Sequence, residues 1–247
     1  MGEVIAILSG KGGTGKTTIC AAVATCLAAE KKRVLCIDAD IGLRNLDIAL
    51  GMDREQYYIS FMDVIKGRYS LTDAAAHPRL PELRLLSSPF REGEDEIDLP
   101  SFGRLIKQIR REYDFCLIDS PAGIGKGFRL ATAFADRGLV VATPDPASLR
   151  DAERAADIAR MAGLREQHLI VNRIDKKMFS KTSWTIDYMM DEVGIPLAGL
   201  IPEDKHVLMS AIHGVPLIYT TGKGAAEACL RISKRLWQDP TLPLMMR

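Results

Sequence analysis

The fold is decided by Gly10-Lys11-Gly12-Gly13-Thr14-Gly15-Lys16-Thr17-Thr18, which lies between the apolar run Val4 to Leu8 and an alanine-rich stretch from Ile19 to Glu30. A glycine, four further residues and then Gly-Lys-Thr form the pattern of a loop that binds a nucleoside triphosphate. Backbone N–H groups surround the phosphates, the lysine reaches the β and γ oxygens, and the hydroxyl binds Mg²⁺. A strand-like run precedes this motif and a helix-like run follows it, so an ordinary glycine-rich turn is the weaker alternative.

Lys11 is a second lysine within the same short loop. Two ammonium groups this close repel each other unless a polyphosphate or a neighbouring acidic group compensates them. A solvated surface lysine is the simple interpretation. The alternative is a lysine that crosses a dimer interface to the nucleotide of a second subunit, as an arginine finger does.

Two further motifs place aspartates directly after apolar runs. Asp38-Ala39-Asp40-Ile41-Gly42-Leu43-Arg44-Asn45-Leu46-Asp47 follows Val34 to Ile37. Phe115 to Ile118 leads into Asp119, and Gly123 beyond it is the expected hinge. Carboxylates at the end of a buried strand are costly unless a metal ion or donors compensate them. Hydrated Mg²⁺ would do so, and an aspartate in line with the γ-phosphate would orient the attacking water. An aspartate-rich turn that caps a helix is the alternative for the first motif.

Composition indicates one domain over residues 1–247, with a short flexible tail at 238–247. The chain is 47% hydrophobic and 26% charged, which is enough apolar content for one core. Its formal net charge of +1 argues against wholesale electrostatic binding of nucleic acid. The first apolar run is short, and no run reaches the roughly 18 residues of a membrane span. We therefore expect a cytoplasmic protein.

The cysteines lie within apolar segments, and no two of them form a Cys-x-x-Cys pair. We expect small core residues rather than ligands of an iron–sulfur cluster. The residues concerned are Cys20, Cys26, Cys36, Cys116 and Cys229.

Short apolar runs that alternate with longer segments predict a doubly wound α/β fold, in which a mostly parallel sheet carries helices on both faces. Ligands of such folds bind at the carboxyl ends of the strands. The expected strands are Glu3 to Ser9, Arg33 to Asp38, Leu83 to Leu86, Phe115 to Asp119, Gly138 to Ala142, His168 to Asn172 and Leu197 to Leu200. The expected helices are Lys16 to Glu30, Ser101 to Glu112, Phe128 to Ala135, Ala147 to Met161, Thr182 to Val193, Asp204 to Ile212 and Gly224 to Trp237. The acidic stretch Ser87 to Pro100 is expected to be a loop.

Lys-Gly-Gly-Thr-Gly-Lys-Thr at residues 11–17 resembles the deviant Walker A motif of the MinD/ParA family of P-loop ATPases, whose signature is the early lysine. Residues 38–47 and 119–124 resemble switch I and switch II of the MinD branch, and the likeness spans about Gly2 to Trp237. It implies an Mg²⁺-dependent ATPase that dimerises with ATP and regulates where a bacterial cell divides. The implied roles are Lys11 crossing to the partner's ATP, Lys16 at the β and γ phosphates, Asp40 orienting water, and Thr17, Asp38 and Asp119 at the metal.

Other stretches resemble the family less closely. Asn172-Arg173 and Pro202-Glu203-Asp204 are similar to the positions that surround adenine, where an amide beside a flat cation suits a purine. Asp204 would also serve as a helix N-cap. Thr143-Pro144-Asp145 and Ser148 to Asp151 resemble segments that approach the dimer partner and the regulatory face. On this match the switch toward the dimer and other partners comprises Asn45, Gly123 and Asp151, and regulators of the MinC and MinE kind are the expected partners.

Three features depart from the MinD branch or lie outside its pattern. Switch II continues with Gly125-Lys126, where that branch usually has glutamate. The branch typically ends in a basic amphipathic helix that binds anionic lipid, whereas 238–247 contains two prolines and few apolar residues, which predicts a weak contact with the inner face of the cell membrane. A basic stripe on the segment after Ser101, usually a solvated face, comprises Arg104, Lys107 and Arg111, with Arg110 beside it.

Two other functions fit the same motifs. A partition ATPase of the ParA branch would bind DNA through a basic stripe when loaded with ATP, although the near-neutral charge disfavours this. A relative that positions flagella or another soluble cargo would act through partner proteins, although flagellar relatives usually carry an extension before the phosphate loop. We expect the division-site function and keep these two as alternatives.

Overall fold

The computed structural model describes residues 1–41, 43–52, 58–89, 97–175, 177, 181 and 185–238. Within these residues, eight strands form one sheet in the order β3-β4-β2-β5-β1-β6-β7-β8. Every neighbouring pair is parallel except β3 and β4. The strands are β1 (Glu3–Leu8), β2 (Val34–Asp38), β3 (Ala75–Ala76), β4 (Leu83–Leu86), β5 (Phe115–Asp119), β6 (Arg137–Ala142), β7 (Glu166–Ile174) and β8 (Leu197–Pro202).

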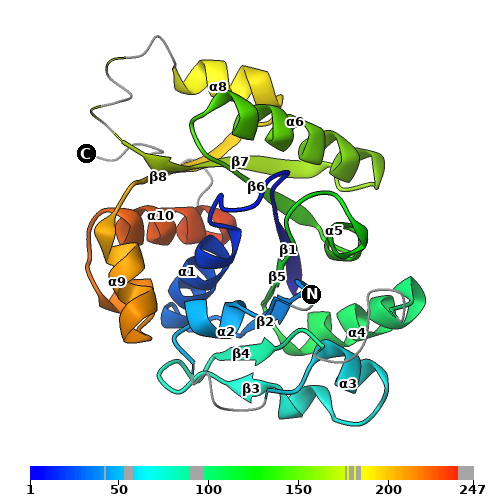
Figure 1. The fold of residues 1–247 in the computed structure, drawn as a ribbon. Helices are drawn as coiled ribbons and strands as arrows, with labels where there is room; N and C mark the ends of the chain where they lie inside the picture. Colours follow the sequence, from blue (N-terminus) through cyan, green and yellow to red (C-terminus); the bar gives the residue numbers. More distant parts are fainter. Residues whose placement is uncertain are drawn as a thin grey trace.

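Helices cover both faces of this sheet (Figure 1). α1 and α10 pack on one face, whereas α4, α5, α6 and α8 pack on the other. The helices are α1 (Lys16–Ala29), α2 (Leu46–Ala49), α3 (Phe61–Ile65), α4 (Leu99–Glu112), α5 (Lys126–Thr132), α6 (Pro146–Met161), α8 (Ile186–Val193), α9 (Lys205–His213) and α10 (Ala225–Trp237), with 3₁₀ turns η1 (Leu71–Asp73) and η3 (Leu217–Tyr219). The doubly wound fold expected from the sequence is confirmed.

Strand β1 lies inside the sheet, and its side chains reach both cores. Val4, Ala6 and Leu8 belong to the core under α4, α5 and α6, whereas Ile5 and Ile7 belong to the core under α1 and α10. Successive side chains of a strand point to opposite faces, so a strand covered on both faces needs an unbroken apolar run. This placement brings the loop after β1 to the edge of the sheet where the neighbouring parallel strands also end.

Most predicted elements agree with the structure to within a few residues, and β4 and β5 have the expected bounds. The sequence pattern did not predict β3, α2, α3, η1 or η3, because elements of two to five residues are too short to show a period. No helix in the described part of the chain is both long enough and apolar enough to cross a bilayer.

Some predicted boundaries are wrong. The expected loop Ser87 to Pro100 ends too late, because α4 already begins at Leu99. There the Asp98 carboxylate accepts a hydrogen bond from the Ser101 N–H at 2.9 Å, and proline fits the first helical turn. Helix α5 spans Lys126–Thr132 rather than Phe128 to Ala135. Residues 90–96 of the expected loop, 182–184 of the expected helix and 239–247 of the expected tail lie outside the described residues.

Candidate nucleotide site

The glycine-rich loop connects β1 to α1 in a conformation that requires glycine. Gly13 and Gly15 have φ angles of 78° and 95°, which side chains rarely tolerate. A Cβ at Gly15 would collide with the Asn172 amide, and one at Gly10 would collide with the Asp151 carbonyl oxygen. The loop is therefore enclosed by β7 on one side and by α6 on the other.

The start of α1 is suited to an anion. Gly15 is its N-cap, no side chain caps the helix, and its first turn contains no acidic residue. The first N–H groups of a helix lack intrahelical partners and carry the positive end of its dipole. Phosphate oxygens would satisfy these donors, as the sequence analysis expected for Gly10 through Thr18.

Asn172 contributes to the loop in a way that the sequence did not reveal. Its Nδ2 donates a 2.8 Å hydrogen bond to the Thr14 carbonyl oxygen, and the side chain is buried. The residue therefore connects the end of β7 to the phosphate loop, in addition to lining the cavity expected for adenine. No local pattern predicts this bond, because 158 residues separate its partners.

Three charged groups are buried together behind the loop. Lys16 is 7% exposed, and Asp38 and Asp119, which pair in register on β2 and β5, are each 1% exposed. Burial, together with the charge of Asp38, raises the pKa of Asp119 to about 8, although the Thr17 hydroxyl and Lys16 oppose the shift. Burial lowers the pKa of Lys16, against the charges of Asp119 and Asp40.

This cluster fits Mg²⁺. Asp119 Oδ1 is buried without a hydrogen-bond partner, and the Thr17 hydroxyl bonds the same carboxylate. Within the described residues, no three His, Cys, Asp or Glu side chains form a metal site by themselves. That agrees with the chemistry of Mg²⁺, which usually binds one or two protein oxygens together with substrate phosphates and water. Asp119 and Thr17 are the residues that would hold it.

Asp38 has a different environment from Asp119. Its Oδ1 accepts the Asp40 N–H at 3.0 Å, and its Oδ2 accepts the N–H groups of Asn45 and Leu46 at 3.3 and 3.2 Å. Burial raises the pKa of Asp38 to about 6, although these bonds lower it. The carboxylate predicted near the metal therefore also contacts the switch I backbone.

A cavity of about 640 Å³ adjoins the loop and contains the residues expected around adenine. Arg173, whose φ is 59°, lies at its rim with Nε 4.0 Å from a Glu203 carboxylate oxygen. The walls come from α1, α2, α9 and α10. The residues of this cavity that were predicted from the sequence to bind nucleotide are Gly15, Thr17, Thr18, Asn172, Arg173, Pro202 and Asp204, and Asn45 of the predicted partner switch also lines it.

Asp204 joins two walls of this cavity. One carboxylate oxygen caps α9 through the His206 N–H at 2.9 Å, and the other accepts the Ala225 N–H at the start of α10 at 3.0 Å. The predicted N-cap is confirmed. The second bond, which the sequence did not indicate, requires the close approach of Gly224, where a Cβ would collide with the carboxylate.

The residues predicted to face a dimer partner lie around the loop. Lys11 is about half exposed, and its Nζ is 3.9 Å from Asp145 Oδ1 of the same chain. Burial raises the pKa of Asp145, but the bonds from Thr143 and Ser148, with the Lys11 charge, hold it below its ordinary value. Asp151 packs against Gly10, and Gly123 in switch II has a φ of 82°.

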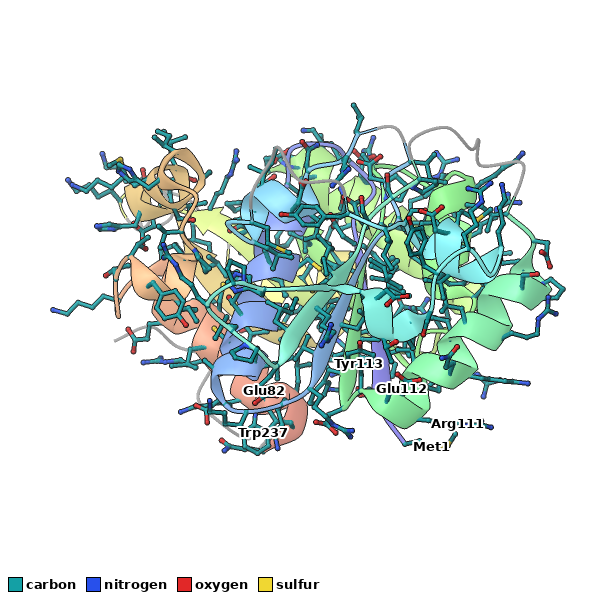
Figure 2. The ribbon with its side chains drawn as sticks, turned by 90° about the horizontal axis from the view of Figure 1, so that it is seen from below. Met1, Glu82, Arg111, Glu112, Tyr113 and Trp237 are labelled. Carbon is teal, nitrogen blue, oxygen red and sulfur yellow. The ribbon has the colours of Figure 1, made fainter. Side chains whose placement is uncertain are left out.

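The basic stripe lies on α4, away from the candidate site. Figure 2 shows Arg111 at the same end of the molecule as Met1 and Trp237. Because β1 begins beside Met1 and ends at the phosphate loop, this end is opposite the nucleotide site. Arg104, Lys107 and Arg111 are exposed, whereas Arg110 forms a 2.5 Å ion pair with Asp136. All five cysteines are buried, as predicted.

A mostly parallel sheet with a glycine-rich loop, an uncapped helix start and buried aspartates at one edge defines the class of P-loop nucleoside triphosphatases. Residues 2–160 match the family model described as an AAA domain. The chain is 36% identical over 220 residues to the septum site-determining protein MinD of Synechocystis, covering 88% of this chain and 82% of that protein. It belongs to the MinD/ParA family of deviant Walker A ATPases.

Two solved structures of relatives have the same fold over nearly their whole length. The MinC:MinD cell division protein complex of Aquifex aeolicus gives a TM-score of 0.89 at 35% identity, covering 99% of this chain and 98% of that one. Septum site-determining MinD of Pyrococcus horikoshii, complexed with Mg-ADP, gives 0.83 at 27% identity and covers 98% of both chains. The predicted family and fold are therefore confirmed.

Proposed function

We propose that this protein is an Mg²⁺-dependent ATPase whose nucleotide state controls the formation of a homodimer, and that it acts in placing the division site. The observation that carries the proposal is the pair of buried charges Lys16 and Asp119 beneath a glycine-rich loop, with the half-buried Thr17 hydroxyl on the Asp119 carboxylate and one unpartnered Asp119 oxygen. Such a group is costly without a ligand that brings both a cation and phosphate. The septum site-determining relatives supply the biological context.

Each residue has a role in this proposal. Lys16 and the N–H groups of the loop bind the β and γ phosphates. Thr17 and Asp119 hold Mg²⁺, which supplies positive charge to the phosphate oxygens when bound. Asp40 holds the attacking water and accepts its proton or orients its lone pair. Arg173 and Pro202 enclose the base within the cavity beside α9.

Lys11 would act on the nucleotide of a second subunit. Its position supports this, because the ammonium group is about half exposed and, among the described residues, forms an ion pair only with Asp145, at 3.9 Å. An exposed ion pair of this kind contributes less than about 1 kcal/mol. A second subunit's triphosphate would therefore compete for Lys11 at little cost.

The experiment compares Lys11→Ala with the wild type and with Lys107→Ala, which removes an exposed lysine on α4. Mass is measured by light scattering with ATP or ADP, and hydrolysis by phosphate release. We expect the wild type and Lys107→Ala to dimerise only with ATP. Lys11→Ala should stay monomeric and hydrolyse ATP at least about tenfold more slowly. Unchanged dimerisation and turnover in Lys11→Ala would show that the lysine does not act across an interface.

The proposal extends to partners and location. The Aquifex relative is in a complex with MinC, so a MinC-type regulator is the first partner to test, and a MinE-type activator is the second. We place the protein in the cytoplasm, with a peripheral contact to the inner face of the membrane. Partition of DNA stays the alternative, because α4 carries the exposed cations Arg104, Lys107 and Arg111.

A further inference from the structure

The Asp38 carboxylate contacts both ends of switch I, defined here as residues 38–47. One oxygen accepts the N–H of Asp40 near the start of the segment, and the other accepts the N–H groups of Asn45 and Leu46 near its end. All three distances lie between 3.0 and 3.3 Å, and the side chain is 1% exposed. Three backbone donors on one buried carboxylate hold the two ends of the segment together.

The end of switch I depends on this carboxylate because α2 lacks a cap of its own. Asn45 is the N-cap of α2, and its side chain forms no capping hydrogen bond. Asp38 takes over that function from eight residues upstream, by accepting the N–H of the first helical residue, Leu46. A carboxylate at a helix start is also favoured by the helix dipole.

Asp119 and Asp38 differ in the hydrogen bonds that their carboxylates accept. The two residues are register partners on adjacent strands and are equally buried. Asp119 has an unpartnered oxygen and a bond to the Thr17 hydroxyl, which are the features of a metal ligand. Both oxygens of Asp38 already accept backbone hydrogen bonds. Asp119 therefore has an oxygen available to a cation, whereas Asp38 binds the backbone of switch I.

We propose that Asp38 is a positioning residue that clamps switch I and thereby places Asp40, rather than a ligand of Mg²⁺. Asp40 is attached through its own N–H, so loss of the clamp moves the residue that orients water. At the outer end of switch I, Arg44 pairs with Asp47 at 3.3 Å and lies over the Tyr58 ring. The inference rests on the proposed ATPase function of this site.

The first test uses the protein without nucleotide, so it does not depend on catalysis. Amide hydrogen exchange is followed by mass spectrometry across residues 38–50 in wild type, Asp38→Asn and Asp119→Asn. We expect exchange in this segment to be at least about tenfold faster in Asp38→Asn than in wild type. The matched variant Asp119→Asn, which loses an equally buried carboxylate from the next strand, should leave that exchange unchanged. Equal protection in wild type and Asp38→Asn would overturn the clamp.

The second test separates positioning from metal binding. Binding of a fluorescent ATP analogue is titrated with MgCl₂, and steady-state hydrolysis is measured for the same proteins. In Asp38→Asn we expect kcat to fall at least about tenfold, with KM for ATP and the Mg²⁺ half-saturation changed by less than about threefold. In Asp119→Asn the Mg²⁺ half-saturation should rise instead. A rise in Asp38→Asn as large as that in Asp119→Asn would make Asp38 a metal ligand and overturn the proposal.

The two tests also distinguish failure of this inference from failure of the proposed function. If wild type did not hydrolyse ATP, the proposed function would fail, while the exchange experiment would still decide whether Asp38 clamps the segment. A circular dichroism spectrum and thermal transition for Asp38→Asn establish that the variant is folded. If it is unfolded, exchange at the Asn45 and Leu46 amides of the wild type decides the question, because rapid exchange there would exclude the clamp.

Discussion

Asp119 is a buried carboxylate whose pKa is raised further than that of the neighbouring Asp38. Its carboxylate is 1% exposed, lies beside Asp38, and leaves one oxygen without a partner. Burial, the largest cause, raises its pKa from the ordinary value near 3.8 to about 8. Such a shift means that the folded, nucleotide-free protein prefers this group protonated.

The raised pKa of Asp119 makes the stability of the folded protein depend on pH. A carboxyl group with a raised pKa in the folded state contributes stability that is complete below pH 4 and is lost as the pH rises toward about 8. Asp119→Asn mimics the protonated form. We therefore expect the Tm of the variant to exceed that of wild type by a margin that grows by roughly several degrees between pH 5 and pH 8.

Differential scanning calorimetry without nucleotide checks this expectation. The control is Asp98→Asn, which removes an exposed carboxylate of the α4 N-cap and should show no comparable growth of the margin. A margin that is constant from pH 5 to pH 8 would mean that Asp119 is already ionised at pH 5. The proposed cost of burying it without a cation would then be wrong.

At the scale of elements, the cavity beside the loop depends on how α9 and α10 meet. The first turns of both helices contact Asp204, which caps α9 and accepts the Ala225 N–H of α10. Loss of one helix cap costs about 1 kcal/mol, and here one side chain serves two helices. The position of α9 is sensitive to this contact because Ser210 is its only buried residue within the described part of the chain.

Asp204→Ala is accordingly expected to lower the free energy of unfolding by about 2 kcal/mol and to weaken binding of ATP by at least about fivefold. Both effects have one cause, the loss of the joint between two walls of the cavity. Urea denaturation and fluorescent-nucleotide titration measure them. Asp98→Ala, which also loses a cap but on α4, should destabilise the protein without changing nucleotide affinity. Unchanged affinity in Asp204→Ala would show that α9 and α10 do not need this joint to enclose the base.

At the scale of the whole molecule, the proposed function predicts that the ATP-bound dimer binds the membrane surface. Asp40→Ala should bind ATP without turning it over, which traps the dimer. We expect this variant to pellet with vesicles of phosphatidylglycerol and phosphatidylethanolamine in ATP but not in ADP. Each subunit contributes a weak membrane contact, and two linked contacts bind more tightly than one. Co-sedimentation measures it, with neutral phosphatidylcholine vesicles as the control.

Absence of pelleting, with the dimer verified by light scattering, would remove the main support for a membrane-cycling regulator. Duplex DNA is then the ligand to test. Binding that appears only with ATP and falls steeply with salt would favour the partition alternative. Charge reversal of Lys107 should weaken such binding, because that residue is exposed on α4.

The sequence alone determined the fold class and the phosphate loop. The loop could be predicted because its chemistry is local, since glycines, a lysine and a hydroxyl must stand at fixed spacing between a strand and a helix. The buried runs of β1, β2 and β5 could be predicted because strands covered on both faces must be continuously apolar. The start of α4 at Leu99 was predicted too late. Its capping residue, Asp98, lies in an acidic stretch whose composition is typical of a loop.

Only the tertiary structure decided how the aspartates divide their roles and how the loop is supported. Asp38 and Asp119 look alike in sequence, each ending an apolar run, and differ in the donors that folding brings to them. Asn172 reaches Thr14 across 158 residues, and Asp204 reaches Ala225 across 21. Local pattern encodes backbone conformation and burial, whereas hydrogen-bond partners and pKa values depend on which distant strands lie side by side. That arrangement exists only once the chain has folded.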